Sequence, residues 1–188
     1  MWETFMQHPV VGNTTLVRDF YANMVQKVFF TSSMVQMRGV AVQISENIIN
    51  THFGITLVSQ NTLPLGYCSF DGSQEELAGL LRGNGDTRWD RKHLLKHMEL
   101  SKDLTILSMF ISASLKPVLH ISSIPVKKAE LLAFVITSAP VDIGRIIKAE
   151  IYDAGDIDIK GKKKKTASRP IPFPCLIIKI CRDARVLE

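Results

Sequence analysis

Apolar residues recur at helical spacing near the start of the chain. Asn13 or Thr14 can cap a helix there, because such side chains accept hydrogen bonds from free backbone N–H groups. The apolar stripe that follows has the spacing of one helix face and consists of Leu16, Val17, Phe20, Tyr21, Met24, Val25 and Val28. This pattern predicts a first helix with a wide apolar side.

Two more apolar faces lie near the end of the chain. Asp142 can cap a helix in which four isoleucines share one face: Ile143, Ile146, Ile147 and Ile151. A last helix is predicted from about Pro174 to Ala184, and the residues that it offers to the core are Leu176, Ile177, Ile180 and Cys181. Both helices are expected to pack through these faces.

Capping signals mark two helices in the middle of the chain. Ser73 and Glu76 form a capping box ahead of a helix that Gly83 ends. Ser101 opens a longer helix that Pro117 stops.

A further run, 125–138, is apolar nearly all round, which predicts a central, buried helix. Pro125 suits its first position, where the missing N–H costs nothing, and Pro140 ends it.

One stretch changes to a period of two. The sequence MVQMRGVAVQIS, residues 34–45, alternates on both sides of Arg38-Gly39 and predicts a β-hairpin with Gly39 in the turn. Ser45 can cap a short helix that Gly54 would end in the left-handed conformation.

Residues 55–72 are rich in turn formers and are predicted to be a loop. The segment 87–100 is predicted to be a short amphipathic helix from about Arg91, and 153–169 a flexible basic loop. The whole pattern predicts a mainly α, loosely α+β protein: a single multi-helix globular domain over 1–188 with one small β-hairpin.

The composition, 46% hydrophobic and 22% charged over 188 residues, lies in the ordinary globular range. The formal net charge is +5, and one block accounts for all of it: Lys160, Lys162, Lys163, Lys164 and Lys165. The basicity is therefore local, unlike the broad basic face of a dedicated duplex-binding protein.

Three cysteines without a CxxC pair argue against a disulfide scaffold and fit a reducing compartment. The first residues lack the basic start and apolar run of a signal peptide, and no stretch reaches the roughly 18 apolar residues of a membrane span. We therefore expect an intracellular protein with no membrane partner.

Four separated stretches, taken in order, resemble one known plant family. They are WETFMQHP and LVRDFYANM within 2–24, VQMRGVAVQISENIINTHFGI at 35–55, ITSAPVDIGRIIKAEI at 136–151, and FPCLIIKICRDARV at 173–186. Together they are similar to the putative plant transposon protein domain, a family found next to retroelement sequences.

The resemblance extends from Trp2 to Val186, with two departures. Arg185 stands where a glycine is commonest, which bears on the end of the last helix, and 55–100 matches only loosely. The resemblance implies a transposable-element origin and a fold, and it supplies no catalytic residues.

The acidic residues offer one candidate catalytic cluster. A cut-and-paste transposase needs three carboxylates that converge on two metal ions, and the tightest group of acids is Asp153, Asp156 and Asp158. They fall in the predicted loop beside the lysines, with no sheet to hold them. We therefore interpret them as counter-charges to the lysine block.

His93 and His97 would share one face of a helix, as zinc ligands do. However, the general-base glutamate of an HExxH motif is absent, and Lys96 would repel a cation. We expect two partly exposed surface histidines.

Cys175 and Cys181 fall in an apolar helix, where a thiol acts as a small hydrophobic group. Arg145 could contact an anion or pair with Glu150 or Asp142. The sequence therefore predicts no enzyme, no catalytic residue, no metal site and no cofactor.

The lysine block has three interpretations. A lysine run can bind a nuclear-import receptor, it can neutralise the phosphates of DNA or RNA whatever their sequence, or it can be a solvated loop without a dedicated partner. Aromatic residues for base stacking are not adjacent, since Tyr152 and Phe173 flank the block at a distance and have plausible core roles.

The first functional hypothesis is a non-catalytic, transposable-element-derived module that binds nucleic acid or protein, with a nuclear location. A Gag-like structural assembly protein is a variant of it. The alternative is a metal-dependent nuclease or transposase-like enzyme that uses the three aspartates of 153–158.

Overall fold

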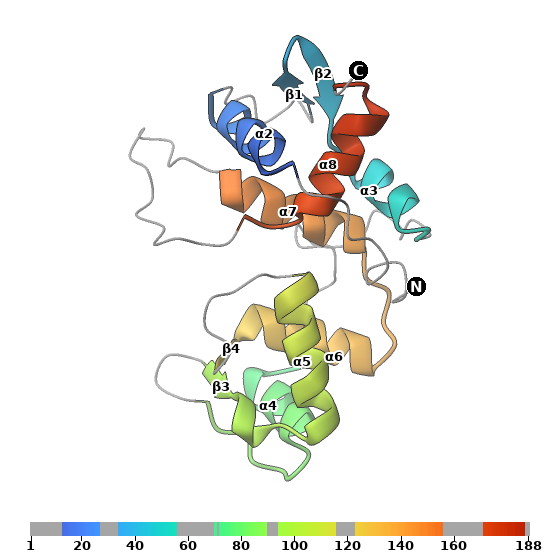
Figure 1. Ribbon diagram of the computed structural model, residues 1–188. Coiled ribbons are helices and arrows are strands. Elements are labelled where there is room, and N and C mark those ends of the chain that lie inside the picture. Colours follow the sequence, from blue (N-terminus) through green and yellow to red (C-terminus); the bar gives the residue numbers. More distant parts are fainter. Residues whose placement is uncertain are drawn as a thin grey trace. The chain divides into compact units, whose positions relative to one another are not determined.

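The computed structural model describes residues 13–26, 34–55, 70, 72–89, 94–115, 123–155 and 171–186. In these ranges the chain forms seven α-helices, a short 3-10 helix and two small antiparallel sheets (Figure 1). The predicted fold class, mainly α with a little β, is confirmed. The second sheet was not predicted.

The chain divides into two compact units. Unit 1 comprises 1–57 and 144–188, and unit 2 comprises 58–143, so unit 2 is inserted between two parts of unit 1. The single domain expected from the sequence stays a prediction, and each unit is described separately below.

Unit 1 is built from four helices and one hairpin. They are α2 (Thr14–Gln26), β1 (Met34–Met37), β2 (Val40–Gln43), α3 (Glu46–His52), α7 (Ile143–Gly155, of which only the first residue is assigned to unit 2) and α8 (Pro174–Asp183). Helix α2 packs on β1 and on α8, and α8 also contacts β2. These are the elements that the periodicity predicted.

The local signals in unit 1 act as expected. The Asn13 side chain accepts a hydrogen bond from the Leu16 N–H at 3.0 Å, and the Ser45 hydroxyl accepts one from Ile48 N–H at 3.2 Å. Gly54 follows α3 with a left-handed φ of 63°. Both turn residues of the hairpin, Arg38 and Gly39, have positive φ, which is the conformation of a two-residue turn that matches the twist of the strands.

The core of unit 1 gathers the predicted apolar faces. Its buried side chains include Leu16, Val17, Phe20, Val35, Met37, Val42, Ile49, Ile146, Ile147, Ile151, Leu176, Ile177 and Ile180. Each element contributes one face to this core, so no single helix of unit 1 is expected to be stable alone.

Asn50 joins the two places where the chain leaves and re-enters unit 1. Its backbone carbonyl accepts a hydrogen bond from the Ile55 N–H at 2.8 Å, and its side-chain oxygen accepts one from the Gly144 N–H, also at 2.8 Å. Asn50 is almost completely buried. The ends of the inserted segment are therefore held by the same residue.

Gly144 lets α7 approach α3 closely. A Cβ atom at this position would lie 2.5 Å from the Glu46 backbone oxygen and 2.6 Å from the Asn50 side-chain oxygen. The hydrogen bond between Gly144 and Asn50 thus depends on the absence of a side chain at 144.

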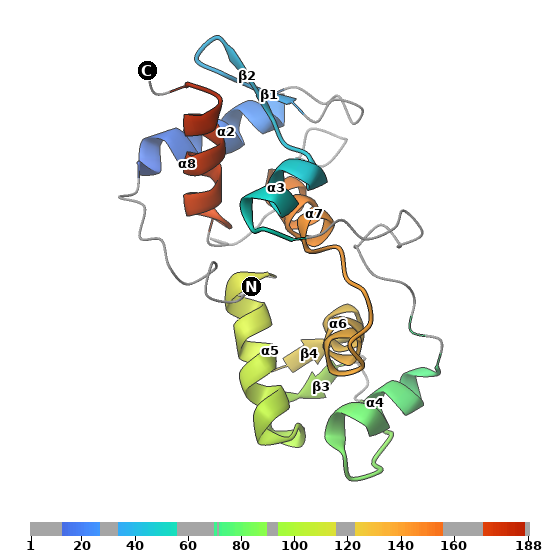
Figure 2. The same ribbon diagram turned by 90° about the vertical axis from the view of Figure 1, so that its right-hand side faces the viewer.

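Unit 2 is arranged around α6 (Val126–Ile136) (Figure 2). This helix contacts α4 (Gln74–Arg82), α5 (Lys102–Ser114) and both strands of the second sheet, β3 (Leu94–Lys96) and β4 (Ser123–Pro125). Its buried apolar residues are Ala129, Leu131, Leu132 and Ala133. The predicted central helix is therefore confirmed, although it ends at Ile136, before Pro140.

Two helix starts in unit 2 were predicted correctly. Ser73 and Glu76 form a reciprocal capping box, and Gly83 ends α4 with φ 69°. The Ser101 hydroxyl accepts a hydrogen bond from Leu104 N–H at the start of α5. Pro117 and most of the predicted loop 55–72 lie outside the described residues.

The helix predicted from Arg91 is wrong. Residues 94–96 form β3, which pairs with β4 so that Leu95 lies opposite Ile124, and a 3-10 helix, η1 (His97–Glu99), follows. Leu95 and Ile124 are fully buried, so pairing with a distant segment outweighs the local helical pattern. Pro125 correspondingly ends β4 and precedes α6 instead of opening it.

No helix within the described ranges is long and apolar enough to cross a membrane.

The close approach at Gly144 yields a stability prediction. Gly144→Ala is expected to lower the free energy of unfolding by about 1–3 kcal/mol, because the added methyl group overlaps backbone and side-chain atoms of α3. Gly79→Ala is the matched control. It lies inside helix α4, its Cβ would meet only the Thr87 methyl at 3.4 Å, and we expect a gain of about 0.5–1 kcal/mol. Urea unfolding of both variants measures the two effects, and equal changes would contradict the packing described for α7.

Candidate functional site

The five lysines predicted as the binding site, Lys160 and 162–165, lie outside the described residues. Two members of the acidic group, Asp156 and Asp158, also lie outside them. The third, Asp153, belongs to the last turns of α7 and is exposed, so its assignment to a loop is corrected.

The structure describes the residues on either side of 156–170, the part of the sequence that contains the five lysines and is called the lysine segment below. Gly155, the last residue of α7, lies against Met24, whose side-chain atoms would be 3.2 Å from a Cβ at that glycine. The Tyr21 hydroxyl donates a hydrogen bond to the Pro172 carbonyl at 2.9 Å. Tyr21 and Met24 are three residues apart on α2 and thus neighbours on its surface.

The two contacts stand on either side of the lysines in the sequence. Lys163 is eight residues after Gly155 and nine before Pro172. The described residues that flank the lysines therefore both contact α2 of unit 1.

A chain of polar contacts crosses unit 2. The Lys128 amine donates to the Ser112 hydroxyl, which donates to the Ser108 carbonyl at 2.7 Å. The Ser108 hydroxyl lies 3.1 Å from the His97 Nε2 atom, and the His97 carbonyl accepts a hydrogen bond from the Thr105 hydroxyl. This chain connects α6, α5 and η1.

Burial lowers the pKa values of the two basic groups in this series of contacts, Lys128 and His97. It lowers the pKa of Lys128 to about 8, because the amine is nearly inaccessible and its partner is a neutral hydroxyl. The pKa of His97 is also lowered, first by desolvation and then by the charge of Lys128. Both groups therefore favour their neutral forms more than they would in water.

An amine beside a serine hydroxyl is also the arrangement of Ser-Lys hydrolases. Here, however, the Ser112 proton points to the Ser108 carbonyl, whereas a nucleophilic serine must give its proton to the base. Ser112 and Lys128 are both buried. We therefore interpret the chain as a structural connection between the helices of unit 2.

His97 begins η1 directly after β3 and does not lie in the helix that the sequence predicted. His93 itself lies outside the described residues. His97 is partly buried and bound to Ser108, and within the described ranges no three His, Cys, Asp or Glu side chains are placed to hold a metal ion.

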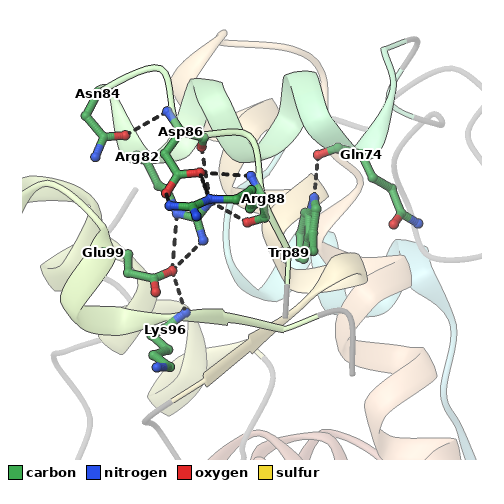
Figure 3. Close-up of polar contacts among 8 residues, drawn as sticks. All are labelled: Gln74, Arg82, Asn84, Asp86, Arg88, Trp89, Lys96 and Glu99. Carbon is green, nitrogen blue, oxygen red and sulfur yellow. Dashed lines mark hydrogen bonds and ion pairs between the residues drawn. The ribbon is translucent and has the colours of Figure 1, made fainter. Parts of the chain in front are cut away.

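A second polar cluster surrounds Arg82 at the end of α4 (Figure 3). Its guanidinium is buried and donates to the Glu99 carboxylate at 2.5 Å and to the backbone carbonyls of Asp86 and Arg88. The Trp89 indole N–H donates to the Gln74 carbonyl at 2.6 Å. The cluster thus ties the turn after α4 to η1 and to the start of α4.

The charges of this cluster act on its carboxylates. The pKa of Glu99 is lowered mainly by its hydrogen bond with Arg82, and the pKa of Asp86 is lowered mainly by its hydrogen bonds with Arg88. A carboxylate with a depressed pKa stabilises the fold above its ordinary pKa, and this contribution is lost as the pH falls. The main partners of Glu99 and Asp86 are Arg82 and Arg88, which belong to the same cluster. We therefore interpret these ion pairs as contacts that stabilise the fold of unit 2.

Three further predicted residues have clear positions. Cys181 is buried, as expected, and burial raises its pKa to about 11, whereas Cys175, interpreted as a small hydrophobic group, is exposed. The Arg145 guanidinium lies 3.9 Å from Glu46 on α3, a partner that sequence separation concealed. Lys148 also pairs with Glu46, at 3.4 Å.

The comparisons with known proteins concern the whole chain. Residues 1–187 match the family described as putative plant retrotransposon-related domain, and the chain belongs to this family. No curated protein and no solved structure matches it. The match covers both units. Three of the four resembling stretches lie in unit 1, and the third stretch, 136–151, begins with residues 136–143 of unit 2.

The pKa of Lys128 makes the stability of unit 2 depend on pH. The folded pKa lies below the ordinary value, so between about pH 8 and 10.5 the unfolded chain binds more protons and stability rises with pH. We expect Lys128→Met to be more stable than the wild type at pH 7 by up to about 3 kcal/mol, and this difference to vanish towards pH 10.5.

The measured quantity is the difference between wild type and variant in urea unfolding at several pH values. This difference cancels Tyr21 and Cys181, whose raised pKa values act in the opposite direction at high pH. A difference that does not change with pH would contradict a buried, destabilised amine at Lys128.

Arg82 and Arg88 provide a matched pair. Arg82→Ala is expected to cost about 2–4 kcal/mol, since it removes the guanidinium donor of two carbonyls and leaves the Glu99 carboxylate with only the Lys96 N–H. Arg88→Ala should change stability little, because this side chain is exposed and its ion pair lies in water. Thermal unfolding of the two variants separates them, and similar losses would refute the locking role of Arg82.

Proposed function

We propose that the protein is a non-catalytic nucleic-acid-binding module of transposable-element origin, with the lysine segment as its principal contact. The observation that supports this proposal is that the described residues on both sides of that segment, Gly155 and Pro172, contact α2. The concentrated positive charge thus lies, in the sequence, between two contacts with one folded unit.

The chemistry of the segment suits a phosphate backbone. Five lysines within six positions supply point charges that neutralise phosphates and release counterions, which favours binding of any sequence. Lys162–Lys165 also suit a nuclear-import receptor, and a nuclear location is part of the proposal.

A nuclease receives less support from the described residues. Asp153 is exposed on α7, and among the residues that the structure describes no metal-binding group of acids and histidines is assembled. Two-metal hydrolysis requires carboxylates fixed on a rigid frame. The lysine segment is the feature that favours binding as the proposed function.

The lysine segment can be tested directly. We expect the variant with Lys162, Lys163, Lys164 and Lys165 changed to Ala to bind a single-stranded oligonucleotide more weakly than the wild type. The slope of log affinity against log salt should fall in magnitude by up to about 3, because each phosphate contact contributes about 0.7. Fluorescence anisotropy over a salt series measures both quantities.

The control carries arginine at the same four positions, which keeps the charge, and it should bind like the wild type. Equal affinity and equal salt slope for the alanine variant would remove the lysine segment from the proposed interface.

A further inference from the structure

Two arginines of unit 1 occupy backbone conformations that arginine adopts only at a cost. Arg38 in the hairpin turn has φ 49°, and Arg185 after α8 has φ 62°. In this left-handed region the Cβ atom of an ordinary residue is crowded, so asparagine and glycine are favoured. Glycine or asparagine at these two positions would therefore make the folded state more stable than arginine does.

The positions have well-defined local roles. Arg38 precedes Gly39 in a turn for which Asn-Gly is the most favoured sequence. Arg185 closes α8, since its N–H donates to the Arg182 carbonyl and the next N–H, that of Val186, donates to the Cys181 carbonyl. This is the Schellman arrangement, whose left-handed position is usually a glycine.

The two strained arginines belong to neighbouring elements. Helix α8 contacts β2, and the charge of Arg38 acts on the Cys181 thiol, one turn before Arg185. The hairpin tip lies beside the C-terminal end of α8 in both views of the molecule (Figures 1 and 2). The two residues therefore belong to the same end of unit 1.

The charges at this end are available to a ligand. Arg38, Arg182 and Arg185 are all exposed. Arg38 lies 3.3 Å from Asp19 on α2, but both side chains remain close to half exposed, and a pair in water binds its partners weakly. Arg182 lies in the last turn of α8, where a cation complements the helix dipole, so its presence has a structural explanation.

We propose that Arg38 and Arg185 form a phosphate-binding surface that contacts the backbone of the same nucleic acid as the lysine segment. This inference rests on the proposed function. Guanidinium groups bind phosphate through two parallel hydrogen bonds, and residues in sparsely populated backbone conformations are enriched at functional sites. Among the described residues Ser138 and Phe173 also have positive φ, but only the two arginines combine this conformation with an exposed cation.

Helix α2 links the two basic features. Its Asp19 contacts Arg38, and its Tyr21 and Met24 contact Pro172 and Gly155, which flank the lysine segment. We expect the bound nucleic acid to pass along α2. The arginines of the folded unit then add a contact to the one proposed for the lysines.

The double variant Arg38→Asn and Arg185→Gly tests this assignment, because it removes both charges and relieves both strained positions. We expect its midpoint of thermal unfolding to rise by about 2–4 °C for each kcal/mol regained. Its affinity for a single-stranded oligonucleotide should nevertheless fall about tenfold, and the salt slope should decrease by about 1–2.

Two controls accompany it. Lys96→Ala with Lys102→Ala removes two exposed charges from unit 2 and should leave affinity nearly unchanged. Arg38→Lys with Arg185→Lys keeps charge and strain, so it should bind more tightly than the Asn/Gly variant and show no gain in stability.

The outcomes separate this inference from the proposed function. A more stable Asn/Gly variant that binds like the wild type overturns the arginine surface, while loss of binding in the lysine variant still supports the module. Absence of nucleic-acid binding by the wild type overturns both proposals. Wild-type binding to vesicles of phosphatidylcholine and phosphatidylserine, without binding to the oligonucleotide, also overturns both.

Discussion

Unit 1 depends on two hydrogen bonds to Asn50, because they close a fold whose parts are separated by a long insertion. One bond fixes the chain just before it leaves the unit, and the other fixes it where α7 begins. Both acceptors are buried, so loss of the side-chain oxygen would leave the Gly144 N–H without this partner. The small size of Gly144 then decides how closely α7 can approach α3.

The two units differ in the kind of polar and charged residues that they contain. Unit 1 holds the elements of the family-like stretches, both ends of the lysine segment and the strained arginines. Unit 2 contains two polar clusters in which buried cations are satisfied inside the protein, Arg82 by carboxylate and carbonyl oxygens and Lys128 by a serine. Buried polar networks of this kind fix the arrangement of helices more than they add stability.

Local signals in the sequence were sufficient for most helix boundaries. Ser45, Ser73 and Ser101 cap helices because each offers a side-chain oxygen to N–H groups within the next few residues. The β3–β4 pair could not be found in this way, since Leu95 meets its partner Ile124 only after the chain has passed through α5. The buried position of Lys128 was likewise hidden, because a lysine on an apolar helix usually extends to solvent. For the candidate site, the sequence identified the lysines but not the arginines. The two arginines come to the same end of unit 1 only through the packing of α8 on the hairpin, and which non-glycine residue of a turn or cap takes a left-handed conformation is not visible in the sequence.

The contacts of Gly155 with Met24 and of Pro172 with Tyr21 also bear on how such a domain can change over time. The entropy of closing a loop between two fixed points grows only with the logarithm of its length, so doubling the length costs about 0.6 kcal/mol. We therefore expect residues to be gained or lost between Gly155 and Pro172 with little effect on the stability of unit 1, as long as both contacts remain. The number of lysines in this segment can then change while the helices of unit 1 stay the same.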